Sequence, residues 1–191
     1  MAEDKYIEKN KFGQIVVEGK YTNGKKHGRW YRYGRLGQKM DMKTYNFGKL
    51  TGIYQFYYEN GSVHEEGTYE QGVLHGRQTI YYENGKIFKE GTMKNGIVAG
   101  EWIFYYKNGH IQERGTLDGD IKQGRWRRYY DNGHLSEDGN YKNNRKIGEW
   151  INYWPNGKIR NKGSYDDSQK QIGQWFFHRD DGTVQEVKDF D

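Results

Sequence analysis

The sequence predicts an all-β protein, an elongated array of about eight 24-residue β-hairpin repeats that form a twisted antiparallel meander. Two series of glycines predict this fold. The first series is spaced by 24 residues with its last member one residue late: Gly28, Gly52, Gly76, Gly100, Gly124, Gly148 and Gly173. The second keeps the same period: Gly13, Gly37, Gly61, Gly85, Gly109, Gly133, Gly157 and, one residue late, Gly182. A fixed period of this length is typical of repeat arrays, in which each repeat packs chiefly against its neighbours.

Five of the repeats contain an aromatic run, an Asn-Gly dipeptide and an alternating segment, as in EWIFYYKNGHIQERGTL around Asn108-Gly109. We expect a β-hairpin with a two-residue type I′ turn, because Asn and Gly both tolerate the positive φ that this turn needs. The dipeptide recurs at Asn60-Gly61, Asn84-Gly85, Asn132-Gly133 and Asn156-Gly157. The pattern predicts about sixteen strands, two per repeat. We expect an N-terminal cap at residues 1–12, the array at 13–182 and a C-terminal cap at 183–191.

Composition limits the possible functions. Hydrophobic residues make up 33% of the chain and aromatic residues 17%, too few aliphatics for a thick core but too many aromatics for a disordered chain. The sequence contains no cysteine, which excludes disulfides and thiolate metal sites. The first residues, MAEDKYIEKNKF, contain no apolar run, so we expect no signal peptide, no membrane span and a cytoplasmic location. The net charge of +5 favours acidic partners.

Strand alternation predicts one packed face. A turn at Asn108-Gly109 would pair Tyr106 with Ile111, Phe104 with Glu113 and Trp102 with Gly115. The packed face would then carry Trp102, Phe104, Tyr106, Ile111, Gly115 and Leu117, followed in the next repeat by Trp126, Arg128, Tyr130, Leu135, Gly139 and Tyr141. We expect each indole to cover the bare backbone of the glycine opposite it.

The opposite face carries one tyrosine per repeat: Tyr33, Tyr57, Tyr81, Tyr105, Tyr129 and Tyr153. These rings could shield the hydrogen bonds of the sheet. They could also form a contact surface, because tyrosine gives a large contact area at small entropic cost and is enriched at interfaces. The candidate partner-binding residues are Tyr57, Tyr81, Tyr105, Tyr129, Tyr153, Arg125, Arg127, Arg160 and Lys162.

No catalytic or metal site is expected, because polar residues recur along the array without forming one distinct cluster. His110 and His134 occupy equivalent positions in successive repeats. Their backbones should lie about 10 Å apart, which disfavours a shared zinc with bonds of about 2 Å. We interpret both as solvated surface side chains. The sequence contains no phosphate loop and no nucleophile elbow, and we expect no cofactor.

The segment YYENGKIFKEGTMKNGIVAGEWIFYYKNG resembles the variant MORN repeats of bacterial proteins. The Lys26-His27-Gly28 and Leu74-His75-Gly76 junctions resemble the HG step of ordinary MORN repeats, and the resemblance extends from about residue 10 to 180. It implies a scaffold for proteins or acidic lipid and, in bacteria, an antitoxin or immunity protein. The second repeat departs from the pattern and is expected to be distorted or specialised: Gly34 replaces a tyrosine, Leu36 precedes the turn glycine, and Lys43 replaces the strand glycine.

Three classes of partner remain. The first is a protein, a toxin or effector neutralised by occlusion. The second is carbohydrate, because repeats rich in Trp, Tyr and Gly are also similar to cell-wall-binding repeats. The third is acidic lipid or nucleic acid. Residues 121–163 are basic, but carboxylates are interleaved with the cations. A nucleic-acid groove is normally more uniform in charge, so the sequence favours an acidic protein surface and no nucleic acid.

Overall fold

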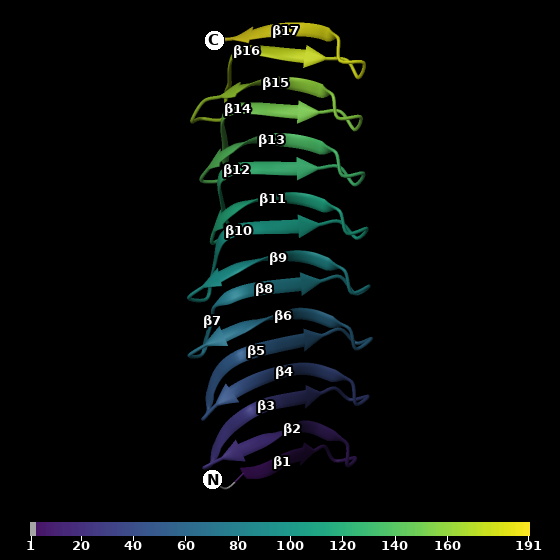
Figure 1. Cartoon of the computed structure of the whole chain (residues 1–191), viewed down its shortest axis with the longest axis vertical. Coiled ribbons are helices and arrows are strands. Elements are labelled where there is room, and N and C mark those ends of the chain that lie inside the picture. The colour runs from purple at the N-terminus through teal and green to yellow at the C-terminus, as the bar shows by residue number, and fades with distance from the viewer. Residues whose placement is uncertain (1–2) are drawn as a thin grey trace. The chain divides into compact units, whose positions relative to one another are not determined.

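The computed structural model describes residues 3–191, which contain seventeen β-strands and no helix. The chain divides into an N-terminal unit, Met1–Ile97, and a C-terminal unit, Val98–Asp191. Within each unit, neighbouring strands of the sheet pair antiparallel and lie side by side (Figure 1). The all-β hairpin array predicted from the glycine period is therefore confirmed. Residues 3–191 contain no helix that could cross a membrane.

The N-terminal unit contains nine strands: β1 (Glu3–Lys9), β2 (Ile15–Thr22), β3 (Lys25–Tyr33), β4 (Lys39–Asn46), β5 (Lys49–Tyr57), β6 (Val63–Glu70), β7 (Val73–Leu74), β8 (Gly76–Tyr81) and β9 (Ile87–Lys94). The C-terminal unit is built from eight: β10 (Ile97–Tyr105), β11 (Ile111–Asp118), β12 (Ile121–Tyr129), β13 (Leu135–Lys142), β14 (Arg145–Tyr153), β15 (Ile159–Tyr165), β16 (Gln171–His178) and β17 (Val184–Phe190). The count exceeds the expected sixteen because β7 and β8, separated at His75, occupy the place of one strand.

The Asn-Gly loops are longer than predicted. In the loop of β10 and β11, the amide of Gly109 donates to the carbonyl of Tyr106, and the amide of Tyr106 donates to that of His110, both at 2.9 Å. Gly109 has φ +96°, whereas Asn108 is not in the positive-φ region. The predicted type I′ turn at Asn108-Gly109 is therefore wrong. The loop has three residues and ends in a left-handed glycine.

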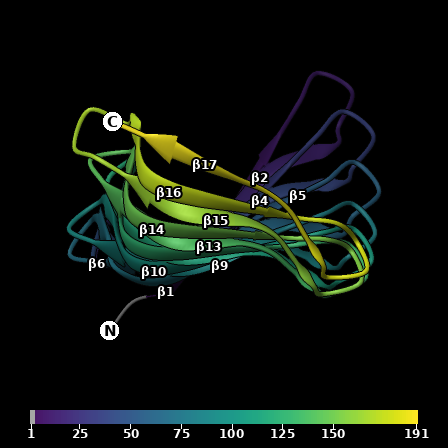
Figure 2. The same ribbon diagram turned by 90° about the horizontal axis from the view of Figure 1, so that it is seen from above.

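Type I′ geometry occurs instead at the other ends of the hairpins. Asn23 and Gly24 have φ +50° and +71°, and Asn143 and Asn144 have φ +53° and +65°. Within each unit, the three-residue loops and these tight turns lie at opposite ends of the strands (Figure 2). Both ends use residues that tolerate positive φ, so composition alone did not distinguish them.

The predicted register holds in the body of the hairpin and fails near the loop. Trp102 pairs with Gly115 and Phe104 with Glu113, as predicted. The register then shifts by one residue, so that Tyr105 pairs with Ile111. The predicted pairing of Tyr106 with Ile111 is wrong, because the three-residue loop requires a bulge beside it.

The packed face is confirmed by burial. The five tryptophans at the repeated position, Trp30, Trp102, Trp126, Trp150 and Trp175, and Tyr54 are 1–4% exposed. Four of these five indole N–H groups donate to a carbonyl of the preceding strand at 3.2 Å: Trp30 to Lys20, Trp126 to Thr116, Trp150 to Asn140 and Trp175 to Ser164.

The indoles do not cover the glycine that was predicted. A Cβ built on Gly115 would lie 2.3 Å from the ring of Trp126, and one on Gly139 would lie 2.3 Å from that of Trp150. Each ring thus covers a glycine of the preceding hairpin. The reason is a register shift between hairpins. Arg114 pairs with Arg127, and Thr116, two residues further along β11, pairs with Gln123, which is four residues away from Arg127 on β12. The extra residues of β12 form a bulge beside Gly115, and Gly124 within it has φ +63°.

The divergent second repeat is specialised. Lys43 takes the place of the strand glycine, so no bare backbone receives a ring there. Tyr54 covers Gly67 of its own hairpin instead, where a Cβ would lie 2.8 Å from the tyrosine ring. Gln78 stands where the next tryptophan would be, and its amide donates to Tyr54 Oη at 3.1 Å and to Glu65 Oε1 at 2.8 Å. The replacement of the strand glycine by Lys43 is therefore accommodated at the next two ring positions: Tyr54 covers a different glycine, and Gln78 replaces a tryptophan.

Candidate partner-binding face

We call the side of each unit that alternates with the packed tryptophans the tyrosine face. In the N-terminal unit it carries Tyr33, Tyr57 and Tyr81, and in the C-terminal unit Tyr105, Tyr129 and Tyr153. All six side chains are half-buried. Each lies at the end of a long strand, just before the three-residue loop, and three residues after the packed ring position of that strand. Strand alternation therefore places them as predicted.

In the N-terminal unit the tyrosine hydroxyls already have partners. Tyr33 donates to Glu18 and Tyr81 to Glu66, both at 2.6 Å, and Tyr57 donates to Gln55 at 2.7 Å. Burial, followed by the hydrogen bond to the glutamate, raises the pKa of Tyr33 to about 12. The same causes raise the pKa of Tyr81 to about 12. These hydroxyls are protonated at neutral pH and satisfied within the fold.

Two tyrosines of the C-terminal unit differ. The hydroxyls of Tyr129 and Tyr153 make no hydrogen bond to any residue from 3 to 191. Burial raises the pKa of Tyr153, and the charge of Asp138 adds to the effect. The two rings are held by the sheet while their hydroxyl groups remain available. This arrangement suits the recognition of an external polar group.

The two candidate arginines share one carboxylate. Arg125 donates from Nε to Oδ1 of Asp138 at 2.8 Å and from a terminal nitrogen to Oδ2 at 2.6 Å. Nε of Arg127 lies 3.6 Å from the same Oδ2. Burial would by itself raise the pKa of Asp138, but the hydrogen bonds and charges of the two arginines hold it below its ordinary value. Their positive charge is thus partly neutralised within the fold.

The structure separates the last two candidates. Lys162 pairs in register with Ile151 and Phe176, and its Nζ lies 5.4 Å from the centroid of the Phe176 ring. Arg160 is the extra residue of a bulge, and its guanidinium lies 4.8 Å from the centroid of Trp154. Trp154 directly follows Tyr153, so alternation directs its ring to the opposite side. The prediction that alternation places Arg160 beside the tyrosines is therefore wrong, because the bulge shifts its side chain.

Replacing Asp138 with asparagine tests this pairing. We expect the free energy of unfolding to fall by about 1.5–3 kcal/mol at neutral pH, the usual worth of hydrogen bonds to a charged group. The pKa of Asp138 is lower in the folded than in the unfolded chain. The stabilisation is therefore complete above the unfolded value, about 3.9, and is lost as the pH falls through the folded pKa.

Urea unfolding across this pH range measures the effect, with the exposed strand residue Glu101, replaced by glutamine, as the control. The difference in free energy of unfolding between the Asp138→Asn variant and the wild type should disappear at acidic pH. A difference in free energy of unfolding that stays constant with pH would show that the charge of Asp138 does not cause the stabilisation.

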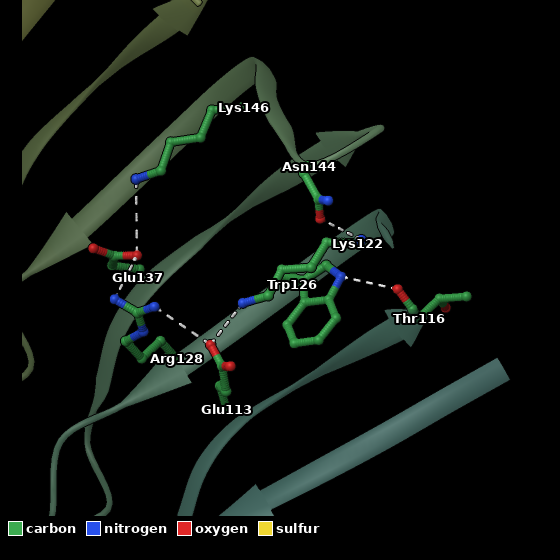
Figure 3. A network of polar contacts seen from close by, with 8 residues as sticks. All are labelled: Glu113, Thr116, Lys122, Trp126, Arg128, Glu137, Asn144 and Lys146. Atoms are coloured by element: carbon green, nitrogen blue, oxygen red, sulfur yellow. Dashed lines mark hydrogen bonds and ion pairs between the residues drawn. The ribbon is translucent and has the colours of Figure 1, made fainter. Parts of the chain in front are cut away.

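The packed face carries a network of charged side chains, of which the sequence placed only Arg128 on this face. Nζ of Lys122 lies 4.0 Å from the centroid of the Trp126 ring and 2.9 Å from Glu113 Oε2 (Figure 3). Arg128 lies between Glu113 and Glu137, at 3.4 and 3.6 Å. Lys146 repeats the arrangement, over Trp150 at 4.0 Å and beside Glu137 at 3.8 Å. Because these charges are satisfied by one another, we assign the network a structural role. The four-residue spacing of Lys122 and Trp126, repeated by Lys146 and Trp150, is the sequence pattern that could have predicted this network.

His110 and His134 also have a structural role. Nδ1 of His110 lies 2.6 Å from the carbonyl oxygen of Asp131, and Nδ1 of His134 lies 2.6 Å from that of Pro155. Each imidazole therefore connects its loop to the next loop, while both side chains remain exposed as the sequence predicted. Within residues 3–191, no three His, Cys, Asp or Glu side chains are grouped so that they could hold a metal ion.

The family model described as "MORN repeat variant" matches residues 50–71, 74–95, 99–118, 122–143 and 146–167, together more than half of the chain. The chain belongs to the MORN repeat variant family. MORN repeats are in general protein- or lipid-binding motifs, and their all-β fold is a repeat scaffold rather than a catalytic fold. The five matched MORN repeats begin after the divergent second repeat.

No curated protein matches the chain significantly. Among solved structures, the chain is similar to a chain in "Crystal Structure of TcdB2-TccC3-Cdc42", with 11% sequence identity and a TM-score of 0.23. The alignment covers 92% of this chain and 13% of that chain. At this TM-score the similarity supports no conclusion about fold or function.

Proposed function

We propose that this MORN repeat protein is a non-catalytic binder that captures a protein partner on the tyrosine face of its C-terminal unit. The partner is a bacterial toxin or effector with an acidic surface, which the protein neutralises in the cytoplasm as an antitoxin or immunity protein. The observation that carries the proposal is the pair Tyr129 and Tyr153, whose rings are held in the sheet while their hydroxyls have no hydrogen-bond partner among residues 3–191.

The neighbouring side chains support a protein partner. Tyrosine and arginine are the residue types most enriched at binding hot spots. The side chain of Arg127 is 36% exposed and that of Arg125 is 60% exposed, so both keep donors available beside Asp138. Rigid rings, guanidinium donors and one carboxylate together form a patterned surface. Such a pattern favours a partner with fixed complementary groups.

The alternative is a scaffold that binds anionic lipid or carbohydrate through the same aromatic and basic face. Lys162, Arg125 and Arg127 would attract anionic headgroups, and the tyrosine rings would stack on sugars. The carboxylates Asp138 and Glu149, which lie on the same face, repel an anionic membrane. This charge pattern is our reason for preferring a protein.

The test removes only hydroxyl groups. The variant Tyr129→Phe with Tyr153→Phe is expected to bind the partner about tenfold more weakly or worse, because each lost hydrogen bond costs about 1 kcal/mol. Its stability should be unchanged, since neither hydroxyl has a partner in the fold. Calorimetric titration against the product of the neighbouring gene measures the affinity.

The matched control makes the same chemical change on the packed face. Tyr106 and Tyr130 donate to the carbonyls of Tyr129 and Tyr153 at 2.8 and 2.7 Å. The variant Tyr106→Phe with Tyr130→Phe should therefore lose stability but keep its affinity. Unaltered binding by the Tyr129 and Tyr153 variant would place the site elsewhere. Tight binding to anionic vesicles or wall polysaccharide, with none to the protein, would favour the alternative.

A further inference from the structure

In the C-terminal unit, successive hairpin loops are connected by three side chains. The hydroxyl of Tyr106 donates to the carbonyl of Tyr129 at 2.8 Å, and the amide of Asn108 donates to that of Asp131 at 2.9 Å. His110 contacts the same Asp131 carbonyl. The loop at residues 130–134 repeats these contacts toward Tyr153 and Pro155. The ring, the Asn and the His together close the space between one loop and the next.

The first loop, residues 10–14, lacks all three side chains. Asn10, Phe12 and Gln14 stand where Tyr106, Asn108 and His110 stand in the later loop. Every hydrogen bond that the structure gives to residues 10–14 remains inside the loop, including Asn10 Nδ2 to Gln14 Oε1 at 2.8 Å. Among residues 3–191, no side chain donates to the carbonyls of Tyr33 and Arg35, which correspond to the acceptors Tyr129 and Asp131.

A cavity of about 970 Å³ lies between this loop and the next one, residues 34–38. Its apolar lining includes Phe12, Val16, Leu36 and Met40. Phe12 is 76% exposed and Leu36 is 91% exposed, although both occupy the position that asparagine holds in five later loops. These two apolar side chains make no contribution to closing the loops. Adjacent exposed apolar residues around a cavity commonly mark an interaction site.

The rim of this cavity has a single sign of charge. Its charged lining residues are the two cations Lys11 and Arg35, and no carboxylate lines it. Neither of these two cations forms an ion pair with a residue between 3 and 191. The tyrosine face, in contrast, pairs Arg125 and Arg127 with Asp138. The unpaired cations therefore favour a ligand that brings its own negative charge.

We infer that this cavity binds an acidic segment of a protein partner, which inserts an aromatic side chain between the first two loops. The inserted ring would occupy the place that the Tyr106 ring holds in its loop, with its hydroxyl or indole N–H directed to the Tyr33 or Arg35 carbonyl. Flanking carboxylates would contact Lys11 and Arg35. A concave cavity with polar Asn10, Gln14 and Gln38 on its lining suits a peptide better than the broad surface of a bilayer.

This site goes beyond the function proposed above and shares no residue with it. It lies in the N-terminal unit, whereas Tyr129 and Tyr153 lie in the C-terminal unit. Either site can therefore fail its test without affecting the other.

The test replaces residues of the first loop with those of a later loop of the same protein, so that the connecting side chains can close the cavity. The substitutions Asn10→Tyr, Phe12→Asn and Gln14→His give residues 10–14 the sequence of residues 106–110, YKNGH. We expect this variant to fold and to unfold at an unchanged or higher temperature, because the connecting contacts can now form. A random dodecapeptide library displayed on phage is selected on the wild type and counter-selected on the variant.

The enriched peptides should carry Trp, Tyr or Phe beside Asp or Glu. The best peptide, synthesised and titrated by fluorescence anisotropy, should bind the closed-loop variant at least about tenfold more weakly. The charge-reversed variant Lys11→Glu with Arg35→Glu, which alters only exposed side chains, should show the same loss and serves if the first variant fails to fold. The Tyr129→Phe with Tyr153→Phe variant should bind the peptide normally.

Enrichment without acidic or aromatic residues, or equal binding by wild type and both cavity variants, would overturn the inference. Sedimentation with phosphatidylcholine vesicles containing about a third phosphatidylglycerol is the second arm. Vesicle binding that depends on Phe12 and Leu36, with no peptide enrichment, would also overturn it and assign the loops to a membrane surface.

Discussion

Replacing Trp126 with alanine is expected to lower the free energy of unfolding by about 3–5 kcal/mol, the range measured for large aromatic residues removed from a packed site. The side chain is 3% exposed, and its indole N–H donates to the carbonyl of Thr116 at 3.2 Å. Its ring also lies over Gly115 and beneath the ammonium group of Lys122. Alanine would remove all of these contacts at once and leave a gap between β11 and β12.

Urea unfolding followed by far-UV circular dichroism measures this effect. Ile121, on the same strand and 40% exposed, is the matched control, and its replacement by alanine should cost less than about 1 kcal/mol. If Trp126→Ala unfolded like the wild type, the assignment of the tryptophans to the packed face would be wrong.

Replacing Gly139 with valine is expected to lower the free energy of unfolding by about 3 kcal/mol, toward the upper end of the range for overpacked sites. A Cβ at this position would lie 2.3 Å from the Trp150 ring, so the indole would have to leave its place. Valine is otherwise favoured in strands, and Gly139 does not have a positive φ. The cost therefore reports the contact with the ring rather than backbone strain.

A double-mutant cycle separates these causes. In a Trp150→Ala background, Gly139→Val should lose most of its cost, because the ring that it displaces is absent. Asn140→Val, one residue along the same strand and exposed, is the control and should be nearly neutral. If Gly139→Val lowered the free energy of unfolding by as much in the Trp150→Ala background as in the wild type, the glycine would be needed for another reason.

The placement of the candidate site was partly predictable. Alternation along each strand put Tyr129 and Tyr153 on the face opposite the tryptophans, and the structure agrees. Alternation failed for Arg160, because it is the extra residue of a bulge. The sequence also gave no means of telling which hydroxyls are satisfied. Tyr33 and Tyr129 occupy the same position in their repeats, but only Tyr33 has a glutamate within hydrogen-bonding distance.

The sequence by itself determined the repeat length, the all-β class, the hairpins and the two faces of each strand. These follow from local rules, namely the glycine period and the alternation of side chains, which act within one hairpin. Only the tertiary structure decided how one hairpin meets the next. The bulge at Gly124 moves the Trp126 ring onto Gly115, and the absence of connecting side chains at residues 10–14 leaves a cavity beside Phe12. Such contacts depend on the accumulated geometry of loops and bulges, which a pattern of residue types does not specify.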